Sequence, residues 1–382
     1  MKKYFLALTS ALLIPLLSPG QEDPDFRVSG YFTTMQSAMF DSLSGPFIND
    51  FLIHNRLNFS YSAGSQVAVV LELRNRLFTG DMLRLNPSYP EMIAADRGWL
   101  DLSWNIISRN SFLLNTTADR FYIDLNYEKF QARIGRQRIN WGQAFVWNPN
   151  DIFNAYSFFD FDYTERPGSD AVRLQYFPSW SSAIEAVVKA GYDDKITAAG
   201  LYRWNKWGYD MQLLGGFMDG SDLVAGAGWS GNLFKTSFRG EATWFRPVKN
   251  FSDTSGVFLV TAGIDRVFSD NSVFQFQVMY CNEPPDLSSF SSLYSGTLSA
   301  KNLAFSEFSA FGSFTWAANP LLSLGTSAMW FPDLEGYFAG PSLDYSMAEN
   351  VDFTLIWQHF KGRFAGEKSR INLVFVRIKY SF

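Results

Sequence analysis

Apolar and polar residues alternate with a period of two along most of the chain. A clear example is the run 51–61, where one phase alternates with the other: Phe51, Ile53, Asn55, Leu57, Phe59 and Tyr61 against Leu52, His54, Arg56, Asn58 and Ser60. The same alternation recurs at 67–74, 121–126 and 274–280. Successive side chains of a β-strand point to opposite faces, so each run predicts a strand with one apolar and one more polar face. In a soluble sandwich the apolar face forms the core, whereas in a membrane barrel it faces lipid and the polar face lines the lumen.

The connections between these runs differ in length. Short connections are predicted near Gly64, Glu128, Trp180, Lys206, Asn232, Asp270, Asn319 and Glu349. The intervening connections are often longer, at 41–50, 80–118, 142–168, 247–254, 283–302 and 363–368, although those near Asp193, Gly220 and Gly336 are short. Short periplasmic turns and longer external loops are typical of outer-membrane barrels.

The turns also set the number of strands. The short turns join sixteen strands into hairpins, and strands near Phe26–Phe40 and Arg370–Phe382 bring the number to about 18, with 16 as the alternative. The sequence therefore predicts an all-β fold, a transmembrane antiparallel up-and-down β-barrel formed by a single domain at 21–382. The segment 80–118 is ambiguous, because it can hold a short helix or an extra hairpin.

The chain ends on its last predicted strand. One phase of this strand contains Asn372, Val374, Val376, Ile378, Tyr380 and the terminal Phe382. With Phe382 at the end and Tyr380 two positions earlier, the segment resembles the C-terminal strand of outer-membrane proteins. The resemblance implies that the barrel-assembly machinery recognises these two residues. An ordinary edge strand is the alternative.

The first residues, 1–20, predict a signal peptide. Lys2 and Lys3 precede an apolar run, Tyr4–Leu17, and small residues follow before Gln21. The apolar run is too short for a membrane-spanning helix. We therefore expect export and, with the barrel pattern, a location in the outer membrane of a Gram-negative cell. A buried N-terminal helix is the alternative.

Composition favours a barrel whose outer face meets lipid. Aromatic residues make up 18% of the chain, and no stretch after residue 20 is apolar for the length that a membrane helix needs. Barrels place aromatic side chains at both membrane interfaces. Without 1–20 the chain has 30 basic and 37 acidic residues, which argues against nucleic-acid binding. The single cysteine, Cys281, excludes an internal disulfide.

The most distinctive stretch lies between residues 133 and 174. It contains Gly135-Arg136-Gln137 at the end of a strand, then Trp141-Gly142, and then Trp147-Asn148-Pro149 in the following loop. This order resembles porin-like outer-membrane families of largely unassigned function. The resemblance implies a barrel and suggests transport, but it names no solute.

The loop at 142–168 is long, aromatic and poor in positive charge. Such a loop can fold into a barrel and narrow it. The candidates for shaping a constriction are Trp141, Trp147, Asn148 and Asp151. The alternative is that these residues only anchor the loop against the wall. The sequence also leaves open whether the loop constricts the lumen or plugs it.

Charged residues on the predicted inward face suggest contact with anions. The candidates for solute contact lie on early strands beside the loop: Arg56, Arg74, Arg76, Arg133 and Arg173, with Glu72 and Asp124. Further inward charges are predicted at Lys189, Arg203, Arg239, Arg377, Lys379, Glu185, Glu241, Asp265, Glu307, Asp344 and Asp352. Arginines in a narrow water-filled channel raise the local anion concentration and bind carboxylate or phosphate in a forked geometry. The alternative is an ion-pair lattice with Glu72 and Asp124 that braces the barrel.

Patterns for catalysis or metal binding are weak. The two histidines, His54 and His359, lie on distant strands, and nothing suggests a nucleophile paired with a base. Asp151, Asp160 and Asp162 lack the spacing of a regular Ca²⁺ loop. No phosphate-binding glycine loop or zinc spacing is present. We therefore expect no enzymatic activity, no metal and no cofactor.

The sequence thus favours an outer-membrane pore for the passive diffusion of small hydrophilic solutes, with anions as the suggested class. One alternative is a non-conducting barrel that binds or anchors surface polysaccharide through the aromatic loops Trp141–Phe161 and Leu287–Leu303. An outer-membrane enzyme is a third alternative. The expected partners are outer-membrane lipid, the barrel-assembly machinery and small solutes. The oligomeric state stays open.

Overall fold

A computed structural model describes residues 25–160, 163, 165–249, 251–286 and 299–382 of the chain. The predicted signal peptide at 1–20 lies outside the described residues. The same holds for most of the aromatic loop Leu287–Leu303 and for Asp162.

Nearly all of the described chain is β-structure. The strands are β1 (Phe26–Phe40), β2 (Ile48–Ala63), β3 (Val67–Gly80), β4 (Ser103–Ser108), β5 (Leu113–Tyr127), β6 (Phe130–Gln137), β7 (Ser169–Ser179), β8 (Ser182–Ala190), β9 (Ile196–Lys206), β10 (Tyr209–Met218), β11 (Asp222–Leu233), β12 (Thr236–Pro247), β13 (Val257–Val267), β14 (Val273–Cys281), β15 (Phe308–Asn319), β16 (Leu322–Phe331), β17 (Gly336–Ala348), β18 (Val351–Phe364) and β19 (Glu367–Ser381). Two short helices and three 3-10 turns lie between them: α2 (Asp81–Leu85), α3 (Tyr89–Ala94), η2 (Tyr192–Asp194), η3 (Ala300–Asn302) and η4 (Pro332–Leu334).

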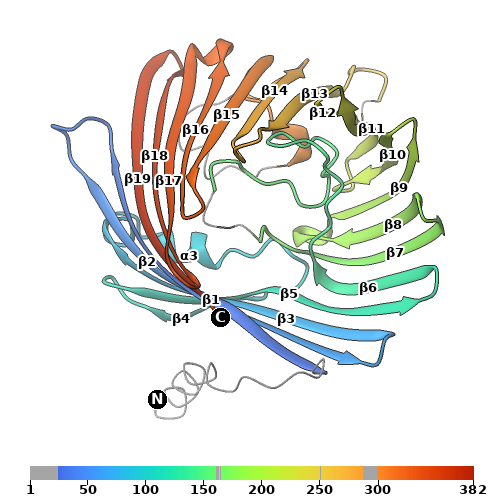
Figure 1. Cartoon of the computed structure of the whole chain (residues 1–382), viewed down its shortest axis with the longest axis horizontal. Helices are drawn as coiled ribbons and strands as arrows, with labels where there is room; N and C mark the ends of the chain where they lie inside the picture. The colour runs from blue at the N-terminus through green and yellow to red at the C-terminus, as the bar shows by residue number, and fades with distance from the viewer. Residues whose placement is uncertain (1–24, 161–162, 164, 250, 287–298) are drawn as a thin grey trace.

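The sheet closes on itself (Figure 1). β1 pairs antiparallel with β2 on one edge and with β19 on the other. At the seam, Gly30 and Phe382 exchange two backbone hydrogen bonds of 2.9 Å. β4 pairs with β5 alone, so the closed ring consists of the other 18 strands. The predicted fold class and strand number are therefore confirmed, and closure leaves the ring without a free edge.

The predicted turn pattern is largely confirmed. All the short connections expected at one end of the barrel join consecutive strands, from Gly64 between β2 and β3 to Glu349 between β17 and β18. The segment 80–118 holds α2, α3 and the extra strand β4. The long connection expected at 363–368 is wrong, because β18 and β19 are joined by Ala365-Gly366 alone. Both residues have positive φ, 47° and 85°, which suits a tight two-residue hairpin.

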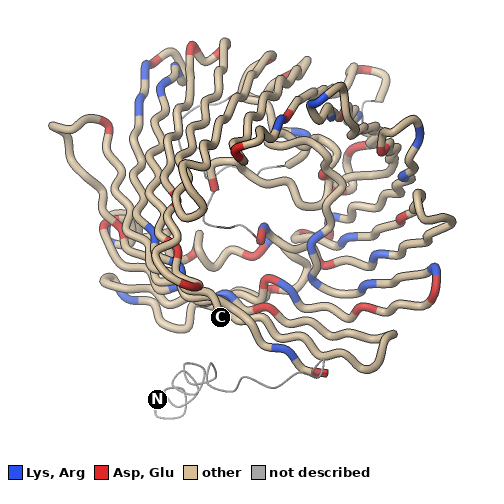
Figure 2. Tube along the Cα trace, viewed as in Figure 1, with Lys and Arg blue, Asp and Glu red and all other residues tan. Residues whose placement is uncertain are grey.

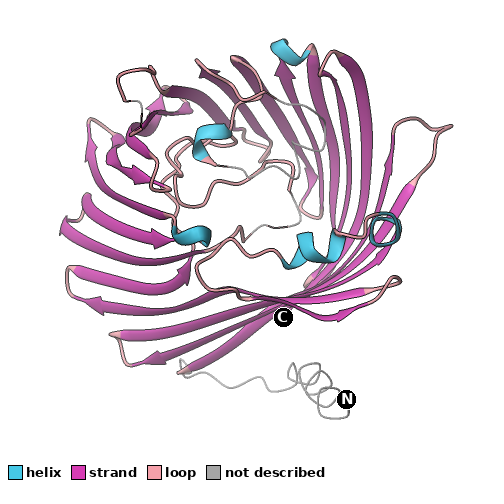
Figure 3. Ribbon diagram, turned by 180° about the vertical axis from the view of Figure 1, so that it is seen from behind, coloured by secondary structure: helices cyan, strands magenta, loops and turns pink. Residues whose placement is uncertain are grey.

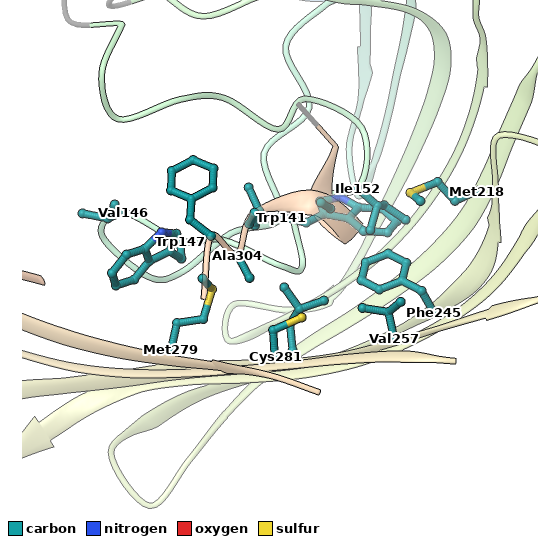
Figure 4. Packing of buried hydrophobic residues seen from close by; sticks show 14 of the residues in the cluster. Trp141, Val146, Trp147, Ile152, Met218, Phe245, Val257, Met279, Cys281 and Ala304 are labelled. Carbon is teal, nitrogen blue, oxygen red and sulfur yellow. The ribbon is translucent and has the colours of Figure 1, made fainter. Parts of the chain in front are cut away.

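The outer face matches the alternation, but the inner face is less polar than expected. Outward side chains such as Ile123, Phe276 and Ile378 are exposed and apolar. Part of the inward face is also apolar and is covered by chain segments 138–160, 165–168 and 299–307, which lie inside the ring (Figure 3). Phe245, Met279 and Cys281 of the wall pack there against loop residues (Figure 4). The expectation of a polar lumen lining is thus wrong for this side of the barrel.

Candidate functional site

The inward loop begins where β6 stops short. β6 pairs with β5 only from Phe121 to Tyr127, and the chain then leaves the wall at Arg138. This departure would leave the first part of β5 without a partner on that edge. β4 fills the gap by pairing with Leu113–Thr117. Because unpaired backbone groups are costly, β4 is what allows residues 138–168 to enter the barrel.

One buried carboxylate holds two separate parts of this loop. Glu241 of β12 is fully buried and faces inward. Its oxygens accept hydrogen bonds from the backbone amides of Gln143, Ala144 and Asn150, the last two at 2.8 and 2.9 Å. Backbone donors thus compensate the buried charge, and Glu241 forms no ion pair within the described part of the chain.

Three further inward side chains hold the loop in the same way. Gln212 of β10 donates to the carbonyl of Trp141 at 2.7 Å. Gln277 of β14 accepts from the amide of Val146 at 2.8 Å and donates to the carbonyl of Trp147 at 3.0 Å. Glu185 of β8 accepts the indole N–H of Trp141 at 2.5 Å. We call Glu185, Gln212, Glu241 and Gln277 the anchor row, since every second strand from β8 to β14 supplies one member.

Two of the proposed constriction residues, Trp141 and Trp147, contact the wall. Trp141 is fully buried and meets the ring of Phe153 edge-on, with centroids 4.8 Å apart. Trp147 packs in the same manner near Phe311, at 6.5 Å. Asn148 and Asp151 are also buried. Trp141 and Trp147 therefore help to seat the loop on the wall, and none of the four candidates is exposed to an open lumen.

Asp151 is an unusual member of this group. Its carboxylate forms no hydrogen bond of ordinary geometry among the described residues. Burial is the main influence and raises the pKa of Asp151 to about 6, opposed by attraction to Arg138 and by the backbone amides of Trp141 and Asn154. The loop therefore contains a carboxyl group that titrates close to neutral pH.

The arginines predicted for solute contact fall into two groups. Arg56 is almost completely buried and contacts Glu72, with Asp119 at 2.5 Å. Asp119 occupies the extra position of a β5 bulge, since Glu72 pairs with Arg120 and Leu73 pairs with Ala118. No pattern in the sequence indicates this bulge, so Asp119 is not among the predicted inward residues.

Arg133 and Arg173 lie directly opposite each other on β6 and β7, and each has a carboxylate partner. Arg133 contacts Asp124 at 2.6 Å, and Arg173 contacts Glu185 at 2.8 Å. Together with the pair of Arg56 and Glu72, these contacts form the ion-pair lattice that the sequence offered as an alternative.

Arg74 and Arg76 behave differently, because they line a cavity of about 640 Å³ on the inner side of β3. Arg74 is 3.4 Å from Asp119 and stacks on the ring of Tyr163 at 3.7 Å. Arg76 donates to the side-chain oxygen of Asn115 at 2.8 Å. It forms no ion pair with any described residue.

We call this cavity the basic vestibule. Its described charged lining consists of Arg74, Arg76, Arg97, Arg136, Arg166, Lys189 and Lys195, against Asp96, Asp119, Asp160 and Asp219. It lies between the β3–β5 wall and the loop, at the end of the barrel that carries the long connections. Arg166 stacks on Tyr156 at 3.8 Å, and burial lowers the pKa of its guanidinium. Arg166 forms no ion pair within the part of the chain that the structure describes.

The two histidines point to opposite faces of the wall, and the described residues hold no candidate metal site. His54 faces inward and packs on Tyr31, whereas His359 faces outward and contacts Asn372. Among the described residues, no three His, Cys, Asp or Glu side chains gather in a way that suits a metal ion. In the same residues, no helix has the length and apolar character needed to cross a membrane.

The two residues of the predicted assembly signal lie at the closing seam. Phe382 is bonded to Gly30 of β1 through its backbone. Tyr380 points outward and is exposed, with its ring centroid 6.2 Å from that of Phe382. Recognition by the assembly machinery stays a prediction.

The protein is thus a closed antiparallel β-barrel of 18 strands with a loop folded into its interior. Residues 118–280 match the family model described as "Protein of unknown function (DUF1302)". No curated protein sequence matches the chain.

Solved structures share the fold at low sequence identity. OccK8 (OprE) of Pseudomonas aeruginosa is 8% identical with a TM-score of 0.60, and covers 94% of this chain and 98% of its own. The outer membrane protein OprD of the same organism is 8% identical with a TM-score of 0.59, covering 94% and 93%. OccAB4 of Acinetobacter baumannii is 9% identical with a TM-score of 0.58, covering 93% and 98%. At such identities the likeness concerns the fold.

Proposed function

We propose that the protein is an outer-membrane pore through which small hydrophilic anions diffuse, and that they enter by way of the basic vestibule. The observation that carries this proposal is the surplus of positive charge around the vestibule, where seven basic and four acidic described side chains meet. A concave site of one sign concentrates ions of the opposite sign. Arg76 and Arg166 are available to a solute because neither forms an ion pair with a described carboxylate, and the same holds for the exposed Arg97 and Lys195.

The ion-paired arginines have a different role in this proposal. The charges of Arg56, Arg133 and Arg173 are compensated by neighbouring carboxylates. They brace the wall between β2 and β8. Of the five sequence candidates, Arg76 is therefore the one proposed for solute contact, and the loop adds Arg166. Arg74 lines the vestibule but contacts Asp119 at 3.4 Å.

The outer surface supports a membrane location. β8 has 9 residues and β10 has 10. Tilted strands of that length rise about 20–25 Å, close to the height of the apolar band of outer-membrane barrels. The turn tips on this side would then lie at the membrane interface. They carry Trp180, Trp207 and Phe234, all largely exposed, and aromatic side chains favour that level.

Bilayer electrophysiology tests the pore. The purified barrel should conduct, and its reversal potential in a salt gradient should indicate anion preference. Replacing both Arg76 and Arg166 by Gln should weaken that preference at least about twofold, because it lowers the vestibule charge. The matched control replaces Arg133 and Arg173 by Gln, which removes the same charge outside the vestibule and should have a smaller effect. Equal effects in both variants would contradict the proposed route.

A silent barrel would favour a second candidate, the non-conducting barrel that binds or anchors polysaccharide. The observation in its favour is the extensive apolar packing of 138–168 and 299–307 against the wall. In that case the wild type would show no current in the bilayer. A variant that releases the loop, described in the Discussion, would then restore conduction.

A further inference from the structure

The outward face of the β18–β19 hairpin carries four basic residues at the end that bears the long connections. Lys361 and Arg363 lie on β18, and Lys368 and Arg370 lie on β19. Figure 2 shows Lys and Arg close to the tip of this hairpin. They share the outward phase, since the intervening Phe360, Gly362 and Phe364 are the buried inward residues. We call these four residues the cationic face.

The pairing register brings like charges together. Lys361 is directly opposite Arg370, and Arg363 is directly opposite Lys368. Directly opposite side chains in an antiparallel pair have Cβ atoms about 4.5–5.5 Å apart, and like charges at that distance repel. The described residues compensate little of this repulsion, because the only ion pair that they form with the cationic face joins Arg363 to Glu335 at 3.0 Å. A bound anion would relieve this repulsion.

An aromatic and polar belt lies next to the cationic face on the same surface. The indole N–H of Trp357 donates to the side-chain oxygen of Asn372 at 3.2 Å, and His359 contacts the same oxygen at 2.8 Å. The hydroxyl of Tyr337 lies 3.4 Å from the other ring nitrogen of His359. Amphipathic rings of this kind suit the boundary between hydrocarbon and headgroups.

The apolar wall continues beyond this belt. Leu355, Val376 and Ile378 point outward and are exposed. Along one surface the chain therefore passes from apolar side chains to amphipathic rings and then to cations. A lipid leaflet presents the complementary order, from acyl chains through the interface to phosphate.

We propose that the cationic face binds the phosphate groups of a phosphorylated glycolipid in the external leaflet, of the lipopolysaccharide type. The inference rests on the proposed outer-membrane location, but not on conduction. Arginine guanidinium groups bind phosphate through paired N–H donors, and lysine adds point charges. The position on the lipid-facing surface, next to the interfacial belt, favours a phosphate carried by a lipid over a free phosphate ion.

Lipid titration of the purified full-length barrel tests the proposal. Lipid-depleted protein in detergent is titrated with bisphosphorylated lipid A, with dephosphorylated lipid A and with inorganic phosphate, and native mass spectrometry counts the bound molecules. We expect preferential binding of the bisphosphorylated lipid. Replacing Lys361, Arg363, Lys368 and Arg370 by Gln should weaken that binding at least about tenfold.

The matched control neutralises four exposed cations at the opposite end of the barrel: Lys129, Lys206, Lys235 and Arg266. This variant should bind lipid A within about twofold of the wild type, because its net charge changes equally but away from the proposed site. Unchanged heat-dependent gel migration verifies that both variants are folded. Equal losses in the two variants would overturn the proposal.

The lipid arms separate the remaining outcomes. Equal binding of phosphorylated and dephosphorylated lipid A would show that the cations do not select phosphate, and would also overturn it. Inorganic phosphate binding as tightly as lipid A would assign the site to a free ion instead. Conductance of the four-residue variant should equal that of the wild type. A wild-type barrel that binds lipid A but does not conduct would contradict the proposed pore and not the proposed lipid site.

Discussion

The backbone amide of Asn150 donates a hydrogen bond of 2.9 Å to the carboxylate of Glu241. It joins the inward loop to a strand 91 residues further along the chain. The same carboxylate accepts the amides of Gln143 and Ala144. A single inward side chain therefore fixes both the entry of the loop and its middle.

Replacing Glu241 by Gln should release the loop. The amide nitrogen of Gln cannot accept a hydrogen bond, so at least one buried donor loses its partner at a cost of about 1–3 kcal/mol. Hydrogen exchange at the loop amides around Asn150 should become faster, and the conductance should rise. Glu367→Gln, at an exposed hairpin tip, should change neither quantity. Wild-type exchange rates in Glu241→Gln would show that this carboxylate does not hold the loop.

Replacing Trp141 by Phe should lower the stability of the barrel. The substitution removes the indole N–H that Glu185 accepts at 2.5 Å, and a hydrogen bond to a charged group contributes about 1.5–3 kcal/mol. The measurement is the unfolding midpoint in denaturant, followed by gel migration. Trp180→Phe is the control, because Trp180 is fully exposed at a turn tip. Equal midpoints for the two variants would argue against a holding role for Trp141.

Loop docking should weaken as the pH rises through the titration of Asp151. Its pKa is raised from 3.8 to about 6 by burial. Below the lower value the carboxyl is protonated whether the loop is docked or released, so it costs nothing. Between the two values the released loop ionises more readily, and above the higher value the full penalty is present. The protection factors of the loop amides, which are exchange rates corrected for the intrinsic rate at each pH, should therefore be higher at pH 5 than at pH 7.5.

Asp151→Asn separates this effect from other titrations. The substitution keeps the size of the side chain and removes the charge. The loop of this variant should be protected at pH 7.5 at least as well as the wild-type loop at pH 5. A pH dependence that persists unchanged in Asp151→Asn would assign it to another group.

Arg56→Gln should destabilise the barrel more than Arg133→Gln. Arg56 is almost completely buried between Glu72 and Asp119, and removing one partner of a buried pair costs about 3–5 kcal/mol. Arg133 is more exposed and its partner Asp124 keeps Gln131 as a donor. Unfolding in denaturant measures both. Similar losses of stability would indicate that the lattice around Arg56 is not the main brace.

The periodic part of the fold could be predicted because every strand of a barrel alternates outward apolar side chains with inward ones. Runs such as 274–280 reveal their outward face directly, and turn lengths at Gly64 or Glu128 show which strands pair. The hairpin turn Ala365-Gly366 was harder to place, since polar residues on either side of it resemble a loop.

The interior could not be predicted in the same way, because its contacts join residues that no period relates. Gln212 and Gln277 bond to backbone atoms of the loop, and backbone atoms carry no sequence signature. Asp119 faces inward only because of a bulge in β5. Phe245 and Met279 face inward although the barrel pattern predicts polar side chains there, because the loop covers them. A possible signal was the placement of an inward Glu or Gln on every second strand from β8 to β14.

The substitution of β4 for β6 beside β5 has a consequence for how such barrels can diverge. Residues 81–112 supply the strand that occupies the edge vacated when 138–168 turns inward. A descendant that lacks 81–112 must therefore lengthen β6 and withdraw 138–168 from the lumen, or else leave an open edge in the wall. The two segments therefore depend on each other structurally, although β5 and β6 separate them in the sequence.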